Sequence, residues 1–334
     1  MARNRSGKAD TTPCQWISEL EAFKRFATHA DGTQSARHIK PLHWYIACRL
    51  VLEGGFDPEE ITPRPPFAVT RRRGRKAGFV LSYAPHLAGT GEQVVLGGLK
   101  TKNVDVVVSK HHIGPVMAVS CKGMTKAFRN LTNRMEETIG ECTNLHITYP
   151  AMVLGYFAVL RANRTAQDVR EAPEIDDNLE DEEPDESQPP TLEGAGEQMP
   201  PRKEQVNAND IAILDDGTPT DSIIRFHAAL CEMTLRHGIR DEISRYEAMT
   251  LALIEPKGDT AGSVFPAFPP EKSPLRLDRF FQTLYQRYEE RFVYGAPLLA
   301  DRGTTPRLVW TDDSPVFGEA EARQLGFLPR RGSV

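Results

Sequence analysis

Apolar residues recur along this chain with two periods, one typical of helices and one typical of strands. The helical spacing predicts helices over residues 38–53, 125–141, 220–237 and 274–292. Alternating or continuous apolar runs predict strands at 67–70, 78–83, 93–96, 103–109, 115–121 and 248–254. The apolar segment 151–161 fits either a buried strand or a short apolar helix. Strands interleaved with helices indicate an α/β fold built on a central sheet.

Two of these strands, 103–109 and 115–121, are predicted to form a hairpin. If residues 111–114 make a four-residue loop, Asp105 lies opposite Ser120 and both side chains leave one face of the sheet. Lys122 joins that face because side chains alternate with a period of two. The other face is predicted to be core, and it carries Val104, Val106, Val108, Val119 and Cys121.

The predicted helix 125–141 carries two neighbouring acids beside an apolar face. That face consists of Phe128, Leu131, Met135, Ile139 and Cys142. At about 100° per residue, Glu136 lies about 95° from the centre of the apolar face and Glu137 lies nearly opposite it. A carboxylate that serves a cleft belongs at the margin of the core, so we expect Glu136 rather than Glu137 to be functional.

Asp105, Lys122 and Glu136 supply the groups that a metal-dependent phosphodiesterase needs. Fourteen residues separate Asp105 from Ser120, and thirteen separate Lys122 from Glu136. Two carboxylates can hold Mg²⁺, a hard cation that prefers oxygen ligands, against a scissile phosphate. A nearby lysine can orient the attacking water and offset the charge that develops on the phosphate.

The order of these elements and side chains resembles the core of the PD-(D/E)xK nuclease superfamily. Asp105, the Ser120-Cys121-Lys122 triplet and Glu136 are similar to the variant site of several type II restriction endonucleases. In that variant a serine replaces the middle acid, and a glutamate on the following helix supplies the missing carboxylate. Val104 stands where the motif has proline, and the gap from Asp105 to Ser120 is shorter than in those restriction enzymes.

The resemblance covers residues 38 to about 160 and implies a role for each matching residue. It implies that Asp105 and Glu136 bind Mg²⁺, for which Mn²⁺ would substitute, and that Lys122 acts on the water or the phosphate. Ser120 would fill the vacated acid position. Glu53, at the end of the first helix, stands where family members often place another acid, although an exposed helix end explains it equally well.

The fold that the resemblance implies is a restriction-endonuclease-like core, with a central mixed sheet flanked by helices. Residues 1–12 are then a flexible tail and 13–165 the nuclease core, with its catalytic hairpin and helix. Residues 166–208, rich in acids, proline and glutamine, have the composition of a disordered linker. Residues 209–334 form a C-terminal α/β segment that completes the sheet.

Charge is distributed unevenly along the 334 residues. The net charge is −5, but residues 174–186 hold nine acids and no base, so the rest of the chain carries +4. This balance permits nucleic-acid binding. The candidate DNA contacts are Arg71, Arg72, Arg73, Arg75 and Lys76 in a basic loop, and Arg129 and Asn133 on the predicted helix 125–141. Solvated surface charge is an equal interpretation of these residues.

Cysteine usage and hydropathy bear on the cellular compartment. The five cysteines are scattered without a CxxC pair, which argues against a disulfide framework or a zinc site and favours a reducing cytoplasm. No apolar run is long enough to span a membrane, and the first residues lack the apolar segment of a secretory signal. We therefore expect a cytoplasmic protein without a membrane partner.

These observations favour a Mg²⁺-dependent DNA endonuclease of the type II restriction or phage-defence class. Its expected substrate is double-stranded DNA, which a homodimer or higher homo-oligomer would cut on both strands. A cognate DNA methyltransferase is a candidate partner. Two alternatives stay open. One is a structure-specific repair or recombination nuclease, and the other is a nuclease-derived DNA-binding or scaffolding protein that has lost catalysis.

Overall fold

The computed structural model describes residues 12–28, 38–74, 77–126, 128, 131–172, 210–295 and 306–332. The predicted tail up to residue 11, and residues 173–208 of the predicted linker, lie outside this set. Within the described ranges, every helix is too short or too polar to cross a membrane.

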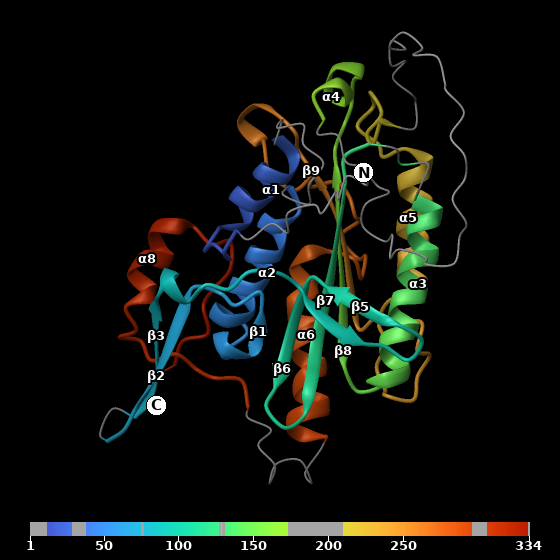
Figure 1. Cartoon of the computed structure of the whole chain (residues 1–334). Coiled ribbons are helices and arrows are strands. Elements are labelled where there is room, and N and C mark those ends of the chain that lie inside the picture. Colours follow the sequence, from blue (N-terminus) through green and yellow to red (C-terminus); the bar gives the residue numbers. More distant parts are fainter. Residues whose placement is uncertain are drawn as a thin grey trace, which may run out of the picture.

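A five-stranded sheet forms the centre of the molecule, in the order β1-β6-β7-β8-β9 (Figure 1). These strands are β1 (Ile61–Thr62), β6 (Val106–Lys110), β7 (Gly114–Met124), β8 (Val153–Arg161) and β9 (Ala248–Ile254). β1, β6 and β7 are antiparallel neighbours, whereas β7, β8 and β9 run parallel. The sheet is therefore mixed, which confirms the predicted α/β class with a central mixed sheet. Its last strand comes from the C-terminal segment.

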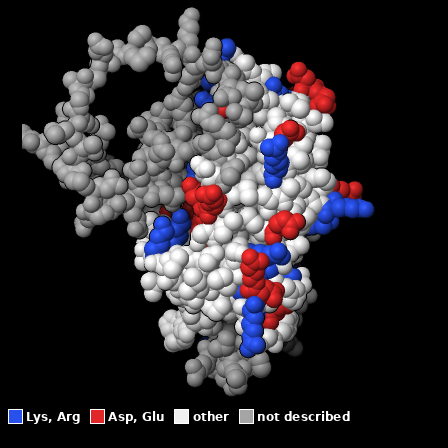
Figure 2. Space-filling view, turned by 90° about the vertical axis from the view of Figure 1, so that its right-hand side faces the viewer, with Lys and Arg blue, Asp and Glu red and all other residues white. Residues whose placement is uncertain are grey.

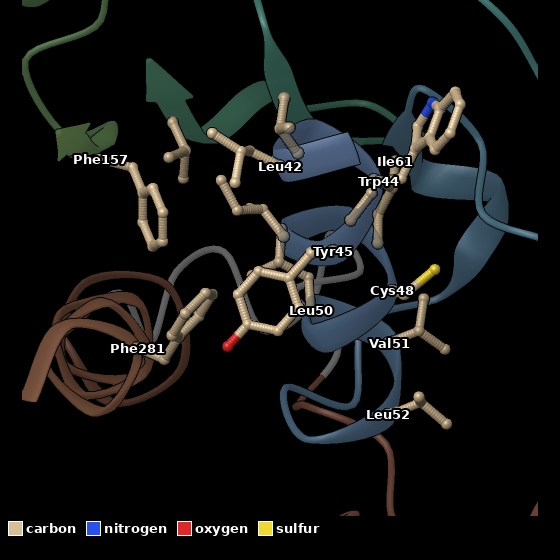
Figure 3. Packing of buried hydrophobic residues seen from close by; sticks show 14 of the residues in the cluster. Leu42, Trp44, Tyr45, Cys48, Leu50, Val51, Leu52, Ile61, Phe157 and Phe281 are labelled. Atoms are coloured by element: carbon tan, nitrogen blue, oxygen red, sulfur yellow. The ribbon is translucent and has the colours of Figure 1, made fainter. Parts of the chain in front are cut away.

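Helices cover both faces of this sheet (Figure 1). On one face lie α1 (Glu19–Thr28), α2 (Lys40–Leu52) and α6 (Leu277–Tyr288), which continues into a π-helical stretch (Glu289–Tyr294). On the other face lie α3 (Leu131–Thr148) and α5 (Asp221–Glu232). Each face has its own hydrophobic core. In the first core, the Tyr45 ring of α2 packs near Phe157 of β8 and Phe281 of α6 (Figure 3).

Smaller elements surround this framework. Two antiparallel ribbons pair β2 (Phe67–Arg72) with β3 (Gly78–Tyr83), and β4 (Gln93–Leu96) with β5 (Thr101–Val104). The short helices are η2 (Pro58–Glu60), η3 (Pro85–Leu87), α4 (Ala166–Arg170), η6 (Gly258–Thr260) and α8 (Val316–Arg323). α4 lies inside the segment predicted to be linker. It forms because Thr165 and Asp168 cap each other's backbone N–H groups in a capping box, so the linker was predicted to begin too early.

The β6–β7 hairpin has the predicted register but a different turn. Val106 pairs with Val119, and extending this pairing by one residue sets Asp105 opposite Ser120. Lys110 pairs with Gly114, so the loop has three residues, and a bulge at Val108 and Ser109 absorbs the difference. Gly114 has a φ of 89°, a conformation that glycine adopts without strain.

Two details of the predicted core were wrong. Val104 ends β5, and the chain bends at Asp105, so Val104 packs in the second core whereas Val106 packs in the first. The helix predicted over 125–141 runs from Leu131 to Thr148, and its Ile139 is 40% exposed. Five polar residues of this helix are buried instead, namely Arg134, Thr138, Glu141, Asn144 and His146. Hydrophobic periodicity misplaced this face because it treats polar residues as exposed.

Candidate metal centre

Asp105 lies at the bend where β5 passes into β6, directly before the first residue of that inner strand of the central sheet. Its Oδ2 accepts a hydrogen bond of 2.6 Å from the backbone N–H of Cys121 on β7. Its Oδ1 lies 3.6 Å from Nε2 of His43, in the first half of α2. The bend and the N–H of Cys121 thus fix the carboxylate of Asp105 beside the strand that carries Ser120 and Lys122.

A third ligand-type side chain reaches the same point. Glu92, directly before β4, places a carboxylate oxygen within 4.8 Å of a ligand atom from both His43 and Asp105. Partial desolvation of its carboxylate and the charge of Asp105 raise the pKa of Glu92, while His43, Lys40 and Lys122 oppose the rise. Lys122 is therefore close enough to this group of three to act on it electrostatically.

The spacing and chemistry of His43, Glu92 and Asp105 fit a divalent cation. Ligand atoms about 2.1 Å from an octahedral ion lie about 3.0 Å apart when adjacent and about 4.2 Å apart when opposite. The separation of 3.6 Å between His43 and Asp105 lies between these two values, so an octahedral ion would need the two atoms to shift by about 0.6 Å relative to each other. One imidazole with two carboxylates suits Mn²⁺ and other first-row ions, since imidazole is a better ligand for these than for Mg²⁺.

The helix α3 brings a different acid to the β6–β7 hairpin from the one expected. The buried carboxylate of Glu141 accepts a hydrogen bond from Oγ of Ser120. Lys102 on β5 places its Nζ 3.9 Å from the same carboxylate. Burial raises the pKa of Tyr156, the β8 neighbour of Ser120, to about 12, with Lys122 lowering and Glu141 raising it. Ser120 and Glu141 thus meet on the α3 side of the sheet, and Lys122 is close enough to Tyr156 to act on it electrostatically.

Glu136 is not brought together with Asp105. It is exposed, and it does not belong to the group formed by His43, Glu92 and Asp105. Five residues before Glu141 along the helix, it points about 140° away from it around the axis. Glu137 is also exposed and pairs with Arg134 at 2.9 Å.

Glu53 belongs to a different polar cluster, at the end of α2. Its carboxylate pairs with Arg49 at 2.7 Å and accepts hydrogen bonds from Tyr285 at 3.1 Å and Gln282 at 3.1 Å. These partners lie on α2 and α6. Glu53 therefore ties these two helices together.

The candidate DNA contacts are dispersed. Arg71 and Arg73 are exposed at the end of the β2–β3 ribbon, and Arg72 pairs with Asp313 at 2.6 Å. Asn133 is exposed on α3. Arg75, Lys76 and Arg129 lie outside the described residues. On the face seen in Figure 2, basic and acidic side chains are interspersed, so the visible charge there does not form a broad patch of one sign.

Comparison with protein-family models, with curated proteins and with solved structures found no match for this chain. The geometry of the site is therefore the basis for a functional proposal.

Sequence reasoning missed two members of the site, His43 and Glu92. His43 lies inside the helix predicted at 38–53, and Glu92 lies between Gly91 and the strand predicted at 93–96. Neither has a diagnostic spacing to Asp105. The available signal was indirect: both are ligand-type residues in segments that precede the Asp105 strand.

Proposed function

We propose that this chain is a divalent-metal-dependent endonuclease that hydrolyses phosphodiester bonds in DNA. One observation carries the proposal: the ligand atoms of His43, Glu92 and Asp105 lie within 4.8 Å of one another, beside the strand of Ser120 and Lys122. Polar side chains from an N-terminal helix, a loop and a strand bend converge there. Packing of the first hydrophobic core does not require polar side chains at this point.

Each residue of the site has a distinct task in this reaction. His43, Glu92 and Asp105 would hold the ion, which when bound supplies Lewis-acid charge to the phosphate and the attacking water. Lys122 offsets negative charge that develops on the phosphate, a contribution of about 3 to 4 kcal/mol for a preorganised group. The N–H of Cys121 orients Asp105, and Glu141 holds the hydroxyl of Ser120 in place.

A restriction-endonuclease-like core is part of this proposal. The order of elements supports it: helix α2 comes first and, after β1 to β5, Asp105 directly precedes the antiparallel hairpin β6–β7, which carries Lys122. The crossover helix α3 and the parallel strand β8 follow. We propose double-stranded DNA as the substrate, a homodimer or higher homo-oligomer as the active form, and a type II restriction or phage-defence role beside a cognate methyltransferase. Mg²⁺ would support the reaction, and Mn²⁺ would bind more tightly because of His43.

A second function has a specific observation in its favour. The middle acid position of the nuclease motif holds Ser120, whose neutral hydroxyl donates a hydrogen bond to Glu141, so this position supplies no anionic ligand. A chain that binds a metal ion and DNA without cutting it would be compatible with this arrangement. The same fold can host either function.

The test is a cleavage assay on unmethylated plasmid and on phage DNA, with Mn²⁺, Mg²⁺ or a chelator. We expect cleavage by the parent with either ion, a loss of at least about a hundredfold in Asp105→Ala, and near-normal cleavage by the control variant Glu137→Gln. Discrete bands mean sequence recognition. Cleavage confined to branched or flapped DNA would favour the repair alternative. Metal binding without any cleavage would favour the inactive alternative.

A further inference from the structure

The β2–β3 ribbon and residues 306–309 enclose a cavity of about 550 Å³. Four arginines line it, namely Arg71, Arg72, Arg73 and Arg307. No acid is among the described residues that line this cavity. Its volume lies within the range of ligand pockets, which is about 300 to 1,000 Å³. The cavity shares no residue with the candidate metal centre.

The arginines divide into a fixed pair and an open pair. Arg72 is held by Asp313 at 2.6 Å, and Arg307 by Glu289 at 2.8 Å. Arg71 lies in β2 and Arg73 follows the end of that strand at Arg72; both are exposed and line the cavity. The cavity therefore carries an excess of two positive charges on its open side.

The floor of the cavity is apolar. Phe79 faces Arg71 across the ribbon, with the guanidinium 6.0 Å from the ring centroid. The backbone N–H of Thr311 donates to the carbonyl of Phe79 at 2.9 Å, so the segment after residue 306 runs alongside β3. Leu308 and Val309 on that segment are partly buried and complete the lining. Cations at the rim thus stand over an aromatic and aliphatic surface.

From this combination we infer that the cavity binds a single-stranded segment of nucleic acid. Arginine forms strong charge-assisted hydrogen bonds with phosphate oxygens, so Arg71 and Arg73 would hold the backbone. An apolar surface beside an aromatic ring suits an unpaired base, which in a duplex is stacked and hidden. The inference builds on the proposed function and favours its repair alternative, since it requires an unpaired stretch of the DNA that the chain would hold outside the metal centre.

Fluorescence anisotropy without metal tests this binding separately from cleavage. The probes are a labelled oligothymidine of about 20 nucleotides, an abasic strand of the same length and a blunt duplex. We expect the parent to bind the oligothymidine at least about tenfold more tightly than either other probe, since stacking and backbone contacts add. The double variant Arg71→Ala/Arg73→Ala should lose at least about tenfold in affinity for the oligothymidine.

A matched control removes two exposed arginines elsewhere. Arg225 on α5 and Arg240 are exposed and do not line the cavity. Arg225→Ala/Arg240→Ala has the same net charge as the test variant and should bind within about twofold of the parent. The slope of log affinity against log salt should fall by about 1.4 in the test variant alone, since each lost phosphate contact removes about 0.7 on a single strand.

The outcomes separate the two proposals. Equal losses in both double variants would show a general charge effect and overturn the cavity as a binding site. Tighter binding to the duplex, or equal binding to the abasic strand, would overturn the single-strand assignment. Cleavage is measured in a separate assay, so a protein that binds without cutting would leave this inference standing and refute only the nuclease proposal.

Discussion

Replacing Asp105 by asparagine is the most direct perturbation of the candidate metal centre. Asparagine has nearly the same shape and keeps an oxygen that can accept the 2.6 Å hydrogen bond from the N–H of Cys121. What it loses is the negative charge that faces His43 and Glu92. The variant should therefore fold like the parent and bind divalent cations poorly.

The size of the effect follows from the number of ligands. Loss of a partner that only orients a ligand typically costs about 10-fold to 100-fold in metal affinity. Loss of one of three direct ligands should cost at least about 100-fold, or about 2.7 kcal/mol. The pKa of Glu92 should fall at the same time, because the charge of Asp105, together with desolvation, raises it. The free energy of unfolding without metal should change by less than about 1 kcal/mol, since the hydrogen bond is kept.

Isothermal titration calorimetry with Mn²⁺ measures this loss. The panel consists of the parent, Asp105→Asn, Glu136→Gln and, as a control at an exposed acid of the same helix, Glu137→Gln. We expect only Asp105→Asn to lose affinity. Mn²⁺ binding that survives in Asp105→Asn but disappears in Glu136→Gln would refute the geometry, and it would return the second carboxylate to the residue that the helical projection selected.

Three further predictions concern other parts of the chain. Lys122→Ala should lower cleavage at least about a hundredfold while Mn²⁺ affinity changes by less than about threefold, because its charge acts on the phosphate; an equal fall in both would contradict that role. Deletion of residues 174–186 should leave the melting temperature nearly unchanged in calorimetry, since loop entropy varies slowly with length; a large decrease would mean that the segment is packed. Desolvation raises the pKa of Asp168, but hydrogen bonds from Lys257, Arg164 and Thr165 outweigh it and lower that pKa to about 2. The stabilisation that ionised Asp168 contributes is thus present above about pH 4 and is lost as pH falls towards 2. Asp168→Asn should therefore lower the free energy of unfolding, measured with urea, by about 1 to 2 kcal/mol at pH 7 and by little near pH 2.

The local regularities of the sequence determined much of the framework. The strand predicted at 248–254 has the bounds of β9, and the helix predicted at 38–53 contains α2. The pairing of Asp105 with Ser120 followed from a valine-rich hairpin with a short turn, although the turn itself is one residue shorter than expected. Such features are accessible from sequence because the alternation of side chains along a strand is fixed by the backbone.

The rotation of α3 was decided by tertiary contacts. Glu141 is buried because Ser120 hydrogen-bonds to it, and Thr138 is buried where its carbonyl accepts a hydrogen bond of 3.1 Å from Tyr246. These partners lie on β7 and just before β9, far away in the sequence. A polar residue is buried only when a partner satisfies its hydrogen bonds. A projection based on hydrophobicity alone ignores such partners, so it selected Glu136 instead of Glu141.

The candidate metal centre depended on the tertiary structure in the same way. The sequence determined that Asp105 and Lys122 lie close together, since one hairpin carries both. It did not determine that α2 would bring His43, and the segment before β4 would bring Glu92, to the same point. Strand alternation is a local property of the covalent chain. The convergence of a helix, a loop and a strand bend depends on how distant segments pack, and no local spacing encodes it.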